Sequence, residues 1–199
     1  MRDFLKDLND AQREAVLHKN GPSMVIAGAG SGKTRVLTYR IVHLMQQGVD
    51  PFNILSLTFT NKAAREMRER IGKLVNESEA KNLWMGTFHS IFARILRIEG
   101  GRLGYPNNFT IYDAEDARKV ITQLIKELNL DTDIYKPKMI ANRISSLKNS
   151  LFTPKAYFNN AELMAQDEAA RVPLMGQIYT AYTERCFRAG AMDFDDLLL

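Results

Sequence analysis

Ala27-Gly28-Ala29-Gly30-Ser31-Gly32-Lys33-Thr34 follows a short apolar run, Met24-Val25-Ile26, and precedes a long helical pattern. That order predicts a strand, a glycine-rich turn and a helix, the arrangement of a phosphate-binding loop. Glycines let backbone N–H groups surround a phosphate, and the helix N-terminus adds partial positive charge. In such a loop Lys33 reaches the β- and γ-phosphates of a nucleotide, and the Thr34 hydroxyl ligates Mg²⁺. The usual pattern begins with glycine, where this chain has Ala27, and the alternative is a merely flexible loop.

The composition of the 199 residues is that of a globular chain, with 45% hydrophobic and 25% charged residues. No apolar run approaches the about 18 residues that a membrane-spanning helix needs. Residues 1–7 alternate in charge without an apolar centre, which is unlike a signal peptide. A lone cysteine, Cys186, excludes an intrachain disulfide and fits a reducing, cytoplasmic compartment.

The net positive charge lies in the first half of the chain. Residues 1–99 have 15 Lys and Arg against 10 Asp and Glu, whereas residues 100–199 have 12 against 13. A basic excess beside a nucleotide site suggests a polyanionic partner. A net charge of +4 is also common among soluble proteins, so the charge decides nothing alone.

A first helix is predicted just before the loop. Asn9 is a good N-cap, Leu8 is placed to act as a hydrophobic staple, and Gln12 falls at the third helical position. The Gln12 amide there either bonds back to the cap or offers a donor and an acceptor to the N6/N7 edge of adenine.

A second helix is predicted after the loop, from Lys33 to Gln47, with Gly48 as its terminating residue. Arg35 directly follows Thr34, at the mouth of the nucleotide site. Its guanidinium group either stacks on a base or is an ordinary solvated surface group.

Two more strands are predicted, Ile54–Thr58 and Leu83–Gly86, and we expect the first to be buried. Met24–Ile26, the helix after the loop and Ile54–Thr58 in succession form a strand–helix–strand unit, which indicates a parallel sheet, hence an α/β fold. Ligands bind at the carboxyl ends of strands in such sheets.

Polar and aromatic residues follow both strands. Phe59-Thr60-Asn61-Lys62 follows the first strand and Thr87-Phe88-His89-Ser90 follows the second. A base stacks on an aromatic ring while polar groups meet phosphate, so this pattern suits single-stranded nucleic acid. The structural alternative is a helix capped by Thr60 beside a buried Phe59, with His89 as a hydrogen-bonded structural histidine.

Taken together, these motifs resemble the N-terminal part of superfamily 1 DNA helicases of the UvrD/Rep/PcrA group. The resemblance rests on Leu8–Gln12, Ala27–Thr34, Thr58–Ala64 and Gly86–Ser90 in that order, and covers essentially the whole chain. It implies ATP and Mg²⁺ as cofactors and single-stranded DNA and its junctions with duplex as substrates, with no membrane. The implied nucleotide site comprises Gln12, Ala27, Gly28, Ala29, Gly30, Ser31, Gly32, Lys33, Thr34 and Arg35. The implied DNA track includes Phe59, Asn61, Thr87, Phe88 and His89.

Helical patterns dominate after about Ile91: Ile91–Glu99, Ala114–Leu128 after an Asp113 cap, Pro137–Leu147 and Pro173–Arg188. The resemblance implies an incomplete RecA-like P-loop motor domain in residues 1–90, an inserted helical subdomain in residues 91–190, and a return to the motor domain in residues 191–199. Residues 134–155 contain no acidic residue and five cations: Lys136, Lys138, Arg143, Lys148 and Lys155. We expect the first four to lie near DNA; the alternative is a solvated helix face.

Three acids near the end, Asp193, Asp195 and Asp196, suggest a metal site at first sight. An N-cap at Asp193 with Asp196 in the first turn of a helix explains them better. A P-loop motor also needs a carboxylate for Mg²⁺ and a base for water. The resemblance places both in an Asp-Glu pair on a later strand, which is absent here.

We therefore expect the 199 residues to be the front piece of a longer ATP-dependent helicase of DNA repair or replication, inactive by itself. Movement from 3′ to 5′ is implied by the resemblance alone, and protein partners stay unknown. The alternatives are a DNA- or partner-binding module with a non-hydrolysing nucleotide site, and an unrelated P-loop kinase.

Overall fold

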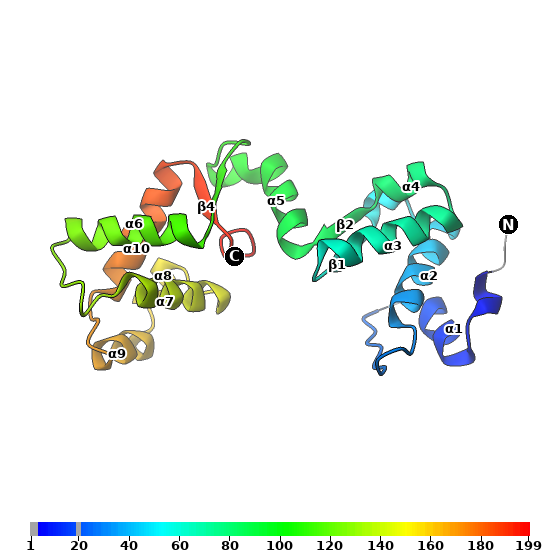
Figure 1. Ribbon diagram of the computed structural model, residues 1–199, viewed down its shortest axis with the longest axis horizontal. Coiled ribbons are helices and arrows are strands. Elements are labelled where there is room, and N and C mark those ends of the chain that lie inside the picture. The colour runs from blue at the N-terminus through cyan, green and yellow to red at the C-terminus, as the bar shows by residue number, and fades with distance from the viewer. Residues whose placement is uncertain (1–3, 19–20) are drawn as a thin grey trace. The chain divides into compact units, whose positions relative to one another are not determined.

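The computed structural model describes residues 4–18 and 21–199 and divides into two compact units, with the division after Ile91 (Figure 1). Residues 1–3, part of the stretch that argues against a signal peptide, lie outside the described residues. The described part is mostly helical and contains two small parallel sheets, so the predicted mixed α/β class is confirmed.

Unit 1 is built around one strand–helix–strand crossover. Its parallel strands β1 and β2 pair from Leu55 opposite Trp84 to Thr58 opposite Thr87. The sequence predicted these two strands and a parallel sheet, but the strand–helix–strand unit that it predicted was the preceding one, over residues 24–58. In Figure 1, α3 and α4 connect the two strands. The helices and strands of this unit are the 3₁₀ turn Phe4–Asp7, α1 Asp10–Leu17, α2 Lys33–Gln46, the 3₁₀ turn Pro51–Asn53, β1 Leu55–Thr58, α3 Asn61–Leu74, α4 Glu77–Asn82 and β2 Trp84–Thr87.

The core of unit 1 is formed by the apolar faces of these helices against the crossover. Val16, Val42 and Ile71 are fully buried in one hydrophobic cluster. The predicted burial of β1 is only partly right, because Leu55 is 52% exposed. One face of this strand is therefore uncovered within the described residues.

The expectation of a strand over Met24–Ile26 is wrong. These residues have no regular structure, and Met24 and Ile26 are 83% and 85% exposed. A strand needs a neighbour that pairs with its backbone N–H and C=O groups. Among residues 4–18 and 21–199, β1 pairs with β2 alone, and no strand lies beside residues 24–26.

Unit 2 is helical, with one short parallel ribbon. The strands β3 and β4 pair from Thr110 opposite Ala191 to Tyr112 opposite Asp193. The residues expected to return to the motor domain, 191–199, therefore pack here in unit 2. Its elements are α5 Phe88–Glu99, which begins in unit 1, the 3₁₀ turn Gly100–Leu103, β3 Thr110–Tyr112, α6 Ala114–Glu127, α7 Pro137–Asn149, α8 Pro154–Phe158, α9 Ala161–Ala169, α10 Met175–Arg188 and β4 Ala191–Asp193.

The core of unit 2 is formed by α6, α7 and α10, and α6 packs against both of the other helices. Ile125, Ile140 and Ile178 are fully buried there, and Tyr179 is buried with them. The sequence did not predict α8 or α9, because each is short and lacks a clear helical stripe. The helix expected from Ile91 begins earlier, at Phe88, and residues 194–198 form turns rather than the expected helix.

No helix among the described residues is both long enough and apolar enough to cross a membrane.

Candidate nucleotide and nucleic-acid site

The glycine-rich loop has the backbone that its sequence requires. Gly30 and Gly32 have φ of +75° and +87°, in the left-handed region that favours glycine. A Cβ on Gly32 would meet the Gln12 side-chain nitrogen at 2.8 Å. Gly32 therefore allows both the turn of the loop and the approach of Gln12.

Gln12 makes the capping contact that one of its two sequence interpretations predicts, and it also bonds to the loop. Its side-chain oxygen accepts from the Asn9 N–H at 3.2 Å, and the Asn9 side chain accepts from the Gln12 N–H at 2.9 Å. This reciprocal capping confirms the predicted start of α1. The Gln12 Nε2 also donates to the Ser31 carbonyl at 2.9 Å, so Gln12 lies against the loop.

Lys33 curls back over the loop. Its ammonium donates to the carbonyls of Ala27 and Gly28, both at 2.7 Å. Thr34 follows in the exposed first turn of α2. The lysine and the start of α2 thus present their positive charge at one place, which is the electrostatic requirement for binding phosphate.

A cavity of about 420 Å³ lies at this loop. Its lining contains no acidic residue, and it comprises Gln12, Gly30, Ser31, Gly32, Lys33, Thr34, Arg35 and Arg70. Arg70 was not predicted from the sequence; it reaches this cavity from α3 because α3 packs against α2. No local pattern predicts that packing. The donors at this cavity, cationic and neutral, fit a polyphosphate.

The carboxyl ends of β1 and β2 place two aromatic residues together. Thr58 Oγ1 donates to the Thr60 carbonyl at 3.0 Å, and it lies 3.4 Å from the Gly86 carbonyl, which ties the two strand ends. The next residues, Phe59 and Phe88, have ring centroids 6.2 Å apart and an interplanar angle of 48°.

Phe59 is 95% exposed and Phe88 is 40% exposed. The alternative of a buried Phe59 is therefore wrong, although Thr60 does cap α3 by accepting from the Ala63 N–H at 3.1 Å. Two large apolar rings at a strand end contribute nothing to the core and leave their faces accessible. The neighbouring predicted residues Asn61 and Lys62 are exposed, and Thr87 and His89 are half-buried.

The basic stretch of α7 divides into exposed and paired cations. Lys136 and Lys138 are exposed and have no ion-pair partner among the described residues. Arg143 instead bonds Asp167 through two nitrogens, at 2.8 and 3.2 Å. The Asp167 side chain is only 4% exposed, so this arginine serves an internal contact.

The expectation that Lys148 faces DNA needs correction. Its side chain is 1% exposed, and its ammonium contacts Asp193 at 2.7 Å and Asp196 at 2.6 Å. The acids near the end of the chain thus neutralise a lysine. No group of three or more His, Cys, Asp or Glu side chains that could hold a metal ion occurs among the described residues.

Comparison with known proteins identifies the family. The profile of the UvrD/REP helicase N-terminal domain matches residues 8–199. A protein named ATP-dependent DNA helicase PcrA from Leuconostoc citreum is 46% identical over 193 residues, which is 96% of this chain and 25% of that protein. Proteins of the same name from Staphylococcus aureus (strain Mu50) and Staphylococcus epidermidis are each 44% identical over 200 residues, 100% of this chain and 26% of theirs.

The chain thus spans about a quarter of the length of these curated relatives. The match extends over the nucleotide loop, the two strand ends and the helical unit alike. The chain belongs to the UvrD/REP helicase N-terminal domain family.

Proposed function

We propose that this chain supplies the nucleotide-binding loop and part of the single-stranded DNA track of an ATP-dependent DNA helicase that moves 3′ to 5′. The observation that carries the proposal is the exposed ring pair Phe59 and Phe88, at the carboxyl ends of paired parallel strands in the same unit as the P-loop. A small-molecule kinase has no use for such a pair, whereas a translocating strand can stack its bases on it.

In this proposal unit 1 is the front part of a RecA-like motor domain. The loop N–H groups and Lys33 hold the phosphates of ATP, and the Thr34 hydroxyl is a ligand for Mg²⁺. Bound Mg²⁺ neutralises charge on the transferring phosphate. Gln12, which bonds to the Ser31 carbonyl, and Arg35 line the same cavity, and we assign both to the adenine of the nucleotide.

The same proposal gives the polar groups beside the rings a role in holding the DNA backbone. Asn61, Lys62, Thr87 and His89 are placed on both strand ends, next to the aromatic pair. In unit 2, Lys136 and Lys138 at the start of α7 are the cations we assign to phosphates. Duplex junctions are the proposed substrate of the whole protein.

Phe59→Ala tests the DNA track. We expect the affinity of the 199-residue chain for single-stranded DNA to fall roughly 5- to 100-fold, because a stacked base is worth about 1–3 kcal/mol. The matched control is Phe52→Ala, which removes another exposed ring, 57% exposed, that precedes β1 instead of following it. Fluorescence anisotropy with a labelled oligonucleotide measures both. Equal losses of DNA affinity in the two variants would contradict the proposed role of Phe59 in the DNA track.

Arg70→Ala tests the nucleotide cavity. Within residues 4–18 and 21–199, the arginine makes a single long ion pair, to Glu66 at 3.9 Å, so it is available to a polyphosphate ligand. We expect affinity for a nucleotide analogue with Mg²⁺ to fall roughly 10- to 150-fold, because one charge-assisted contact is worth about 1.5–3 kcal/mol. Arg65→Ala, an exposed arginine of the same helix outside this cavity, is the control. Isothermal titration of both variants decides, and an unchanged Arg70→Ala affinity excludes the contact.

A further inference from the structure

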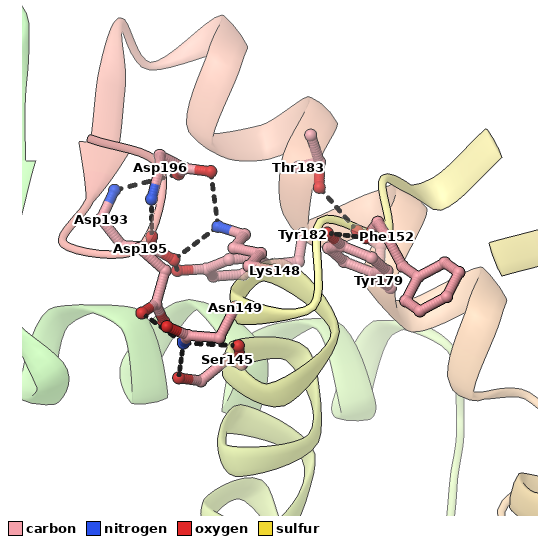
Figure 2. A network of polar contacts seen from close by, with 10 residues as sticks. All are labelled: Ser145, Lys148, Asn149, Phe152, Tyr179, Tyr182, Thr183, Asp193, Asp195 and Asp196. Atoms are coloured by element: carbon pink, nitrogen blue, oxygen red, sulfur yellow. Dashed lines mark hydrogen bonds and ion pairs between the residues drawn. The ribbon is translucent and has the colours of Figure 1, made fainter. Parts of the chain in front are cut away.

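A buried ion cluster joins α7 to the end of β4, as Figure 2 shows. The Lys148 ammonium contacts Asp193 at 2.7 Å and Asp196 at 2.6 Å, and no other cation of the described chain reaches either carboxylate. Burying one ammonium against two carboxylates leaves an excess negative charge, which is costly in a low-dielectric interior. We call Lys148, Asp193 and Asp196 the latch.

The two carboxylates of the latch have unequal hydrogen bonding. Asp193 accepts from Lys148, from the Tyr182 hydroxyl at 2.7 Å and from the Asp196 N–H at 2.9 Å. Asp196 has the ammonium and one N–H, that of Asp193 at 3.0 Å. Asp193 is thus the better satisfied of the two, although both lie at nearly the same distance from Lys148.

This inequality sets the charge of the latch. Burial is the largest effect on Asp196 and raises its pKa; Lys148 opposes this, and the smaller repulsion of Asp193 adds to burial, so the pKa stays above its usual value. Burial also opposes ionisation of Asp193, but Lys148 and the Tyr182 hydroxyl hold the pKa of that carboxyl below its usual value. The other titratable groups that face the latch are all acidic: Tyr105, Tyr179, Tyr182, Cys186 and Asp195.

The latch fixes the last turn of the helix that begins with the exposed cations. Asn149 adds a bond to Asp195 at 3.0 Å, and the Tyr179 hydroxyl holds the Phe152 carbonyl in the turn after α7 at 2.9 Å (Figure 2). A helix of 13 residues is rigid, so fixing its end orients its start, where Lys136 and Lys138 lie.

We propose that Lys148 is a positioning residue: through the latch it orients the DNA-facing start of α7, without touching DNA itself, and Asp196 is the member of the latch that takes up a proton. The positioning role rests on the proposed function. The latch itself does not, so stability and DNA binding are measured separately.

Thermal unfolding of the 199-residue chain tests the latch. Asp193→Asn is expected to lower the Tm of unit 2 by roughly 5 °C or more, because Tyr182 and Lys148 lose their shared charged acceptor. Asp196→Asn should leave Tm unchanged or raise it, because it removes the excess charge. If the two variants lose equal Tm, or if Asp196→Asn loses more, the unequal roles assigned to the two carboxylates are wrong.

The pH dependence of Tm tests the proton. A carboxyl with a raised pKa in the folded state destabilises that state as pH rises through this pKa. The advantage of Asp196→Asn over the unmodified chain should therefore be largest near about pH 8 and shrink toward about pH 4. A difference that is the same at both pH values shows that Asp196 does not take up the proton.

Salt dependence of DNA binding tests the positioning role. Lys138→Ala should reduce the slope of log affinity against log salt by about 0.7, one phosphate contact on a single strand. Lys148→Met should weaken DNA binding several-fold and leave the slope unchanged. If Lys148→Met does not fold, Asp193→Asn, which keeps the Lys148 ammonium, is measured in its place. A slope reduced as in Lys138→Ala makes Lys148 a DNA contact and overturns the proposal. If the unmodified chain binds no DNA, the positioning role fails with the proposed function, while the Tm results still decide the latch.

Discussion

Lys33→Ala is expected to abolish nucleotide-dependent activity in the chain extended to the length of its relatives. We expect ATP turnover to fall on the order of 100- to 1,000-fold, because the substitution removes the one flexible cation that lies within the loop and can follow charge onto a transferring phosphate. In the part of the chain that the structure describes, the Lys33 ammonium bonds the carbonyls of Ala27 and Gly28 alone, and both contacts are exposed, so no buried contact is lost. Stability should change little.

The measurement is the ATPase rate with and without single-stranded DNA. Lys62→Ala is the matched control for turnover without DNA, because Lys62 is an exposed lysine of the same unit that does not line the nucleotide cavity. The 199-residue chain should be silent, and the extended chain should be stimulated by DNA. Unchanged turnover in Lys33→Ala would refute the role of Lys33, and turnover indifferent to DNA would refute the track.

Local chemistry made much of the fold predictable from the sequence. Helix starts at Asn9 and Asp113 are set by side chains that accept from backbone N–H groups two or three residues ahead, and both form as predicted. The cap at Thr60, which was the structural alternative for its segment, forms as well. The parallel direction of the sheet was predictable from the alternation of strands and helices, although the paired strands are β1 and β2 and not residues 24–26 and β1. Contacts between residues that are close in the sequence can be predicted from the sequence alone.

Contacts between distant segments were the part that sequence reasoning could not supply. A strand over Met24–Ile26 depends on a partner elsewhere, and the described residues provide none. Arg70 reaches the nucleotide cavity only because two helices pack together. Lys148 looks like a solvated cation in its own stretch, since its partners come 45 residues later or more.

The second large effect concerns another cation of that stretch, Arg143. Asp167→Ala is expected to lower the free energy of unfolding of unit 2 by about 3–5 kcal/mol, the usual cost of removing one partner of a buried ion pair. Asp167 accepts from Arg143 at 2.8 and 3.2 Å and from the Tyr157 hydroxyl at 2.9 Å, and the substitution orphans both donors. Burial and this bond to Asp167 raise the pKa of Tyr157 to about 12, so the donor stays protonated at neutral pH.

Chemical denaturation of the 199-residue chain checks this, with Glu168→Ala as the control. Glu168 is the next residue of α9 and is exposed, so its loss should cost no more than about 0.5 kcal/mol. If Asp167→Ala proves as mild as Glu168→Ala, the ion pair contributes nothing, and Arg143 returns to the set of cations available to DNA. The difference in unfolding free energy between Asp167→Ala and Glu168→Ala therefore shows whether Arg143 holds α7 to α9 or is available to bind a phosphate. The residues next to Arg143 in the sequence do not encode that distinction.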